Sequence, residues 1–338
     1  MNAFICPFYS DQKCNSFFPE EIKTSTYIWA EVFLCPYINI IDMVLKGIYA
    51  GKPAMFQLWL LLVSLLFGAV LSSLIGTGIF VLSHGVSVNI TQYPDMMRMM
   101  QLLSAIGTFL FPALAVAWLC SADPAAYLCI KRKVDTKILL LALVSMFLMS
   151  PAITLTALLN KQMILPEFMA PVESWMKAQE ALAEQITNTL LAGDGMLTFL
   201  SNLFVIAIMA GITEEFLFRG ALQRIIGQWT SNHHIVIWSA AILFSAFHLQ
   251  FYGFLPRMLL GAYFGYLLYW SRNIWIPVFA HFVNNAFAVI SMSDIHLREN
   301  EFITGDISNA NLLPYSALAV VTLVLFFLCA RHIRRLLQ

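Results

Sequence analysis

The sequence predicts an all-α membrane protein, a polytopic helix bundle of about eight transmembrane helices. Of 338 residues, 60% are hydrophobic and only 11% are charged, against about 25% charged in an ordinary soluble domain. The mean hydropathy is +0.76, and eight apolar runs approach or reach the ~20 residues that cross a bilayer core. These observations exclude a disordered chain, a collagen-like repeat and a soluble Rossmann or barrel enzyme.

The elements follow in chain order. Residues 1–52 hold amphipathic stretches broken by Pro36 and are expected at the membrane interface. An amphipathic helix is expected within 159–195, on the outer surface, and the fourth span is expected to continue as a helix to Ile226 because no proline interrupts it. The expected spans are 56–83, 99–122, 137–158, 196–218, 234–251, 257–271, 274–292 and 313–330.

The distribution of charge predicts the orientation and limits the partners. Nineteen Lys and Arg balance nineteen Asp and Glu, so no net charge would recruit nucleic acid. Basic residues cluster in the loops that lie inside if the N-terminus is inside, which predicts two cytoplasmic termini. The short outer loops favour the prokaryotic inner membrane. The inner basic residues are Lys46, Lys52, Lys131, Arg132, Lys133, Lys137, Arg219, Arg224, Arg272, Arg331, Arg334 and Arg335.

The fourth span and the residue that follows it contain three ionisable residues, Glu214, Glu215 and Arg219. An ionisable group inside a span costs roughly 2.5–3.5 kcal/mol, so each one indicates a function. Glu215 and Arg219 are four residues apart and are expected to form an ion pair. Successive helical residues point ~100° apart, so Glu214 is expected on a different face, without a partner in its own helix.

Two histidines and an asparagine occur in later spans. The hairpin between the fourth and fifth spans turns near residue 231, the midpoint of Glu214 and His248, so these two side chains are expected to face each other. His281 and Asn285 are four residues apart and share one helix face. Interhelical hydrogen bonding remains an alternative for the neighbouring Asn284.

Several common catalytic signatures are missing from the sequence. It has no HExxH zinc helix, no GxSxG nucleophile turn and no complete dinucleotide fingerprint. The Gly193–Gly195 segment lies in an outer loop without a second membrane aspartate, which argues against an aspartyl dyad. One carboxylate, two imidazoles and an amide remain, and this set suits water activation with stabilisation of an oxyanion.

Three motifs in order carry a specific resemblance. Glu214-Glu215-x-x-x-Arg219, Phe244-x-x-x-His248 and His281-x-x-x-Asn285, each on its own expected helix, resemble the signature of the CPBP family. That family includes the type II CAAX prenyl endopeptidases and the bacteriocin-processing or self-immunity proteins, also called ABI. The resemblance covers about residues 195–292, less than a third of the chain.

The resemblance implies an intramembrane peptidase of the glutamic or metallo type, open to the cytosol. Glu214 would be the general base, His248 would hold the attacking water, and His281 and Asn285 would form the oxyanion hole. Glu215, Arg219 and Phe244 would support them. No cofactor is implied with certainty, and zinc held by Glu214, His248 and His281 stays open as an alternative.

The resemblance also divides the chain and leaves the substrate open. Peptides or proteins at the membrane are the expected partners, together with the bilayer, and prenylated CAAX-like sequences are one class of substrate. A non-proteolytic peptide-binding or self-immunity protein is the main alternative, and a transporter with a Glu/His proton relay is the third.

The chain is expected to divide into four parts. These are 1–52 as an N-terminal segment, 53–194 with the first three spans and the outer amphipathic loop, 195–292 as the catalytic core, and 293–338 with an outer loop, the last span and a basic tail.

Overall fold

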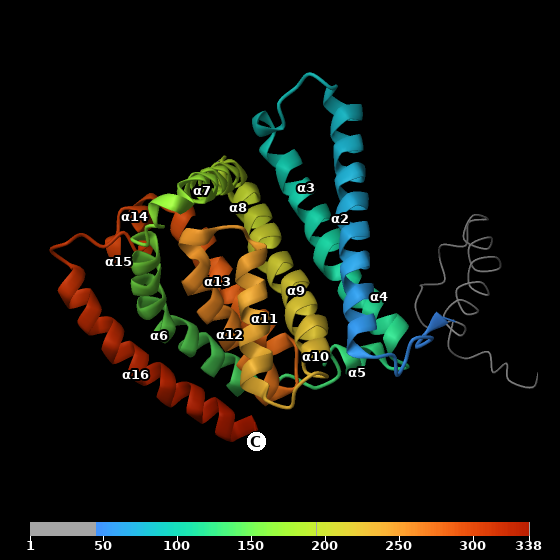
Figure 1. The fold of residues 1–338 in the computed structure, drawn as a ribbon. Coiled ribbons are helices and arrows are strands. Elements are labelled where there is room, and N and C mark those ends of the chain that lie inside the picture. Colours follow the sequence, from blue (N-terminus) through green and yellow to red (C-terminus); the bar gives the residue numbers. More distant parts are fainter. Residues whose placement is uncertain (1–44, 194, 338) are drawn as a thin grey trace, which may run out of the picture.

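Helices make up the fold, as Figure 1 shows. The computed structural model describes residues 45–193 and 195–337, and within these ranges no strand occurs. The expectation of an all-α bundle is confirmed. The expectation for the N-terminal segment falls mainly on residues 1–44 and that for the outer aspartate on Asp194, which lie outside the described residues.

Each of the eight expected spans corresponds to a helix. Six of them are long and apolar enough to cross a bilayer, which makes this an integral membrane protein. The other two are the shorter α11 and the less apolar α12. The eight helical stretches are α2 (Ala54–His84), α3–α4 (Pro94–Cys120, including the π segment η2, Ile106–Leu110), α6 (Thr136–Lys161), α8–α10 (Met196–Ile226), α11 (His233–Phe247), α12 (Phe254–Ser271), α13 (Trp275–Ser293) and α16 (Leu312–Leu337).

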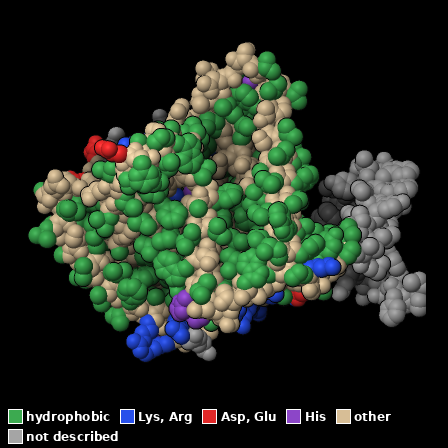
Figure 2. Space-filling view, viewed as in Figure 1, with side chains coloured by type: hydrophobic (Ala, Val, Ile, Leu, Met, Phe, Trp, Pro, Cys, Tyr) green, Lys and Arg blue, Asp and Glu red, His purple; other side chains and the backbone are tan. Residues whose placement is uncertain are grey.

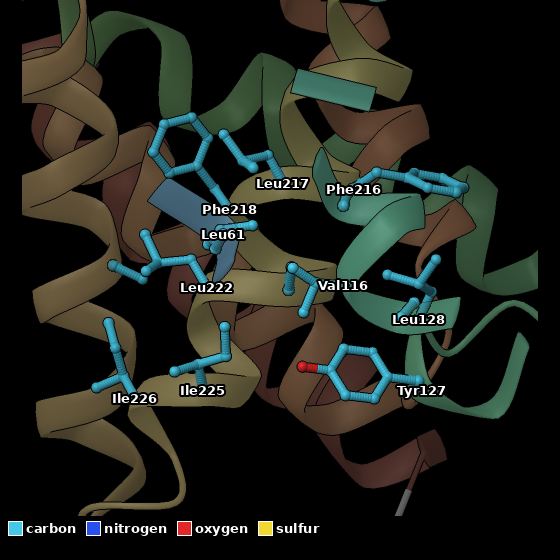
Figure 3. Close-up of a cluster of buried hydrophobic side chains, with 14 of the residues drawn as sticks. Leu61, Val116, Tyr127, Leu128, Phe216, Leu217, Phe218, Leu222, Ile225 and Ile226 are labelled. Atoms are coloured by element: carbon cyan, nitrogen blue, oxygen red, sulfur yellow. The ribbon is translucent and has the colours of Figure 1, made fainter. Parts of the chain in front are cut away.

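Three clusters of buried apolar side chains form the core of the described part of the chain, and the third is small and joins α11 to α12. The first joins α2 and α4 to the lower part of the fourth span and to the short helix α5 (Pro124–Tyr127); Figure 3 shows Leu61, Val116 and Phe216 in this cluster. The second joins α6, α12, α13 and α16, with Phe264 and Leu267 near its centre. The outer faces stay apolar, as Figure 2 shows over much of one side. Phe67 and Leu74 are more than half exposed, as expected for lipid-facing residues.

Helix α11 is shorter than the sequence predicts. The expected span runs to residue 251, but the helix ends at Phe247, and Leu249 adopts a left-handed backbone with φ 55°. The Nδ1 atom of His248 lies 2.9 Å from the Phe244 carbonyl oxygen, so this side chain caps the last turn. Fifteen residues extend only ~22 Å, less than the ~30 Å hydrocarbon core.

The turn that follows α11 is held by a buried asparagine. The Asn160 amide, at the end of α6, donates to the Phe251 carbonyl at 2.9 Å and accepts from the Leu255 N–H at 2.7 Å. Non-helical backbone at membrane depth is tolerated only where its polar groups have partners. Asn160 supplies those partners, and the turn can therefore carry His248.

The expected amphipathic helix of the outer loop forms as α7 (Ala170–Leu191) and lies across the upper end of the bundle in Figure 1. Met176 and Leu190 are buried against the protein. Trp175, Leu182 and Ile186 of the same apolar stripe are exposed. This exposed stripe fits a helix that rests partly on the bilayer surface.

Candidate active site

The fourth span is irregular where it carries the glutamates. Two π-helical segments, η4 (Leu203–Met209) and η5 (Phe216–Leu222), flank the single α-helical stretch α9 (Ala210–Glu215). Such segments are rare and occur frequently at functional sites. A π-helical segment changes the directions in which the side chains of a helix point. The spacing of residues in the sequence does not reveal such a segment.

Glu214 lies between two imidazoles. Its Oε2 atom is 3.8 Å from Nε2 of His248 and 3.8 Å from Nε2 of His281. The Glu214 side chain is 14% exposed and His281 only 6%, whereas His248 is 28% exposed. The structure thus brings together the three residues that the sequence singles out on three different helices.

The other nitrogen of each imidazole is already occupied. Nδ1 of His248 lies against the Phe244 carbonyl oxygen, and Nδ1 of His281 lies 2.8 Å from Oε1 of Glu215. A hydrogen bond at one ring nitrogen orients the ring and leaves the other nitrogen facing the site. Both Nε2 atoms therefore face Glu214.

Glu215 and Arg219 form the expected ion pair, with 2.8 Å between Oε1 and Nη1. Both side chains are fully buried, at 0% and 1% exposure. The Arg219 guanidinium lies 4.4 Å from the centre of the Phe244 ring and donates to the Gly261 carbonyl at 2.9 Å. These contacts offset part of the cost of burying the Arg219 charge.

The two glutamates share a neighbour, which the helical spacing does not predict. Glu214 and Glu215 approach opposite nitrogens of the same His281 ring. The two carboxylates do point in different directions, as expected, but the expectation did not include their common contact with His281. Phe264 stacks on the ring with 5.1 Å between centroids and fixes it between the two acids.

Asn285 lies beside the site, with its amide engaged. Its Nδ2 atom donates to the Ile206 carbonyl in η4 at 3.0 Å, and its Oδ1 atom accepts from Nδ2 of Asn284 at 3.1 Å. Ile206 belongs to a π segment, where the carbonyl pattern is irregular. The bond therefore ties α13 to the irregular part of the fourth span.

Sequence reasoning missed Arg257. This residue, which none of the three motifs includes, lines the same cavity as Glu214, and its Nη2 atom donates to Oε1 of Gln250 at 2.7 Å. Its Nη1 atom is buried and has no hydrogen-bond partner. Gly253 makes room for the guanidinium, which a Cβ would meet at 3.0 Å. The sequence did contain a sign of this role, because Arg257 is a basic residue in the first turn of the apolar helix α12.

These residues surround one cavity of about 260 Å³. Gly253 and Pro256 lie in its wall, beside the α11–α12 turn and at the opposite end of α11 from His233. His233 itself stacks on Tyr269 and takes no part. The remaining lining residues are Glu214, Phe244, His248, Arg257, Leu260, Phe264, His281, Asn284 and Asn285.

One carboxylate and two imidazoles are side chains that zinc binds, but they are not arranged as a preassembled metal site. Within residues 45–193 and 195–337, no three His, Cys, Asp or Glu side chains meet the spacing of a metal site. Glu214, His248 and His281 would be the ligands, since both imidazoles present Nε2.

Fold and site together define a class, an integral membrane protein with a carboxylate and two imidazoles held together between its helices. Residues 196–287 match the family model of the Rce1-like type II CAAX prenyl endopeptidases. The matched segment contains Glu214, His248, His281 and Asn285, and the match confirms the resemblance drawn from the three motifs. Residues 196–287 are thus similar to a family of CAAX-type intramembrane proteases.

A curated relative matches the chain more distantly. The uncharacterized protein YpbD of Bacillus subtilis (strain 168) is 25% identical over 104 residues, which are 30% of this chain and 50% of the relative. The chain therefore spans about half the length of the curated relative it matches. No solved structure shows a significant match.

Proposed function

We propose that this protein is an intramembrane endopeptidase in which Glu214 and His248 activate the attacking water. The observation that carries the proposal is the position of Glu214 Oε2, 3.8 Å from each of two imidazole nitrogens inside a cavity. The family-level match supports the same reaction. Its substrates are peptides or proteins at the membrane, and prenylated CAAX-like sequences are the first class to test.

The separation between these atoms suits a bridging water. A contact of 3.8 Å is longer than a hydrogen bond, and one water molecule between two polar atoms accounts for such a distance. Glu214 takes a proton from the water as its oxygen attacks the peptide carbonyl carbon. The carboxyl group then gives that proton to the amide nitrogen as the C–N bond breaks.

Three side chains would stabilise the oxyanion. His281 presents Nε2 to the cavity and is held by Glu215. Arg257 adds a permanent charge with a partner-free N–H group on the same cavity. The resemblance implies that Asn285 also donates to the oxyanion. One N–H of its amide already bonds the Ile206 carbonyl, so the second N–H would make this contact.

The test compares peptide release by wild-type protein and by Glu214→Gln in purified form. Mass spectrometry of membrane peptides should find fragments released by the wild type only, because glutamine cannot accept the proton. His248→Ala should also be inactive. Glu184→Gln, which changes an exposed carboxylate on α7, is the matched control and should retain activity. Equal release by Glu214→Gln would exclude Glu214 as the base. No release by the wild type, with peptide still bound, would favour the non-proteolytic alternative.

Elemental analysis separates the two mechanistic types. Active protein with well below one zinc per chain supports a glutamic peptidase. Stoichiometric zinc, with activity lost on chelation and regained on adding zinc, would assign Glu214, His248 and His281 as ligands.

A further inference from the structure

A second cavity lies apart from the candidate active site, on the other side of α12. It measures about 1020 Å³ and runs between α6, α12 and α16, so we call it the α16 groove. None of its lining residues lines the active-site cavity. Its walls are mainly apolar and aromatic, with Met149, Leu259, Phe326 and Phe327 among them.

One end of the α16 groove is basic. Arg331, Arg334 and Arg335 line it, and all three are exposed at the last turns of α16. Figure 2 shows Lys and Arg side chains gathered beside histidine at the lower edge of the molecule, near the C-terminal end of α16 in Figure 1. Arg334 lies within electrostatic range of His233 at the start of α11. Positive charge is therefore concentrated at this end of the groove.

Aromatic residues with polar edges lie next to the arginines. Tyr266 stacks on Trp270 with 5.6 Å between centroids, and its hydroxyl lies 2.5 Å from Nδ1 of His234. Tyrosine and tryptophan concentrate at the level of the lipid headgroups, where one edge of the ring is wet and the other apolar. The basic end of the groove is thus expected at headgroup depth, and the apolar remainder at acyl-chain depth.

We propose that the α16 groove binds an anionic phospholipid, with its phosphate on Arg331, Arg334 and Arg335 and an acyl chain along the apolar wall. Basic pockets between transmembrane helices recognise anionic headgroups in this way. A peptide would need hydrogen-bond partners for its backbone. The groove offers few, since Tyr263 already bonds Ser145 and Tyr266 bonds His234. This proposal does not depend on peptidase activity.

The test measures lipid binding to delipidated protein by native mass spectrometry and by thermal stability. Dioleoylphosphatidylglycerol should bind and raise the melting temperature more than dioleoylphosphatidylcholine. Arg331→Gln/Arg334→Gln/Arg335→Gln should weaken phosphatidylglycerol binding on the order of 100-fold, since each basic residue near an anionic surface contributes several-fold. The control Lys131→Gln/Lys133→Gln/Lys137→Gln removes three exposed charges outside the groove and should keep the preference.

Two further arms address the acyl chain and the source of the phosphate. Ala152→Phe, in the apolar wall, should reduce binding of both lipids because it fills the groove. Inorganic phosphate should not compete with phosphatidylglycerol. Equal affinity for the two lipids, unchanged selectivity in the triple arginine variant, or displacement by inorganic phosphate would overturn the proposal.

Discussion

Glu215 shares one carboxylate oxygen between two partners. Its Oε1 atom lies 2.8 Å from Arg219 Nη1 and 2.8 Å from His281 Nδ1. The same buried acid therefore neutralises a buried cation and orients an imidazole that faces Glu214. Stability and chemistry are linked at this one atom, and the two roles can be separated by substitution.

Arg219→Ala should be strongly destabilising. It leaves the Glu215 charge buried without its cation, which costs roughly 3–5 kcal/mol in comparable pairs. Glu215→Gln/Arg219→Gln should recover part of the thermal stability, because no uncompensated charge remains. Activity should stay low in the double variant, since His281 loses its carboxylate partner. Thermal unfolding in detergent, followed by a peptide-release assay, measures both, and wild-type stability of Arg219→Ala would contradict the buried pair.

Arg257→Gln should slow turnover more than it weakens binding. If the guanidinium stabilises the oxyanion, kcat should fall by roughly 10²–10³-fold, as for loss of one oxyanion donor, while KM changes little. Arg257→Lys should recover part of the rate because it restores the charge. Lys161→Gln, an exposed cation at the end of α6, serves as the control. A change in KM alone would assign Arg257 to substrate binding instead.

At the scale of elements, the close approach of α11 and α12 positions the second motif. Gly261 allows it: a Cβ there would lie 2.9 Å from the Phe244 ring and 3.1 Å from Arg219 Nη2. The hairpin thus presses Phe244 against the guanidinium and directs His248 toward Glu214. The short length of α11 also directs His248 toward Glu214, because the helix ends at the depth of the site.

Gly261→Ala should therefore disturb the site through the packing of these two helices. Overpacking of this kind costs typically 1–3 kcal/mol, and we expect a lower melting temperature together with reduced peptide release. Gly78→Ala is the matched control, because a Cβ at Gly78 meets nothing within 4 Å. That control should be neutral or stabilised by about 0.5–1 kcal/mol. Equal melting temperatures for the two variants would show that α11 and α12 can separate without cost.

At the scale of the whole molecule, two features give different indications about access to the site. The basic loops predict that the termini and the hairpin tip at His233 are cytoplasmic. The active-site cavity, however, has Gly253 and Pro256 in its wall, at the other end of α11. Access from the cytosol therefore stays a prediction, and it has to be measured separately from topology.

Green fluorescent protein fused to the C-terminus should fluoresce in a bacterial host, because it folds only on the cytoplasmic side. Alkaline phosphatase inserted in the 162–166 loop should be active outside. Inside-out vesicles that cleave added substrate, with right-side-out vesicles inactive, would place the entrance on the cytosolic side. The reverse result with the same fusion data would place the entrance beside the α11–α12 turn.

The sequence by itself determined the helices, their order and the residues of the three motifs. Apolar length and residue type are local properties, so eight helices, the Glu215–Arg219 spacing and the pairing of Glu214 with His248 could all be predicted from it. Only the tertiary structure decided that α11 ends at Phe247, that Glu215 holds His281, and that Arg257 enters the cavity. These depend on π turns, on capping and on contacts between distant segments, which residue spacing along one helix does not encode.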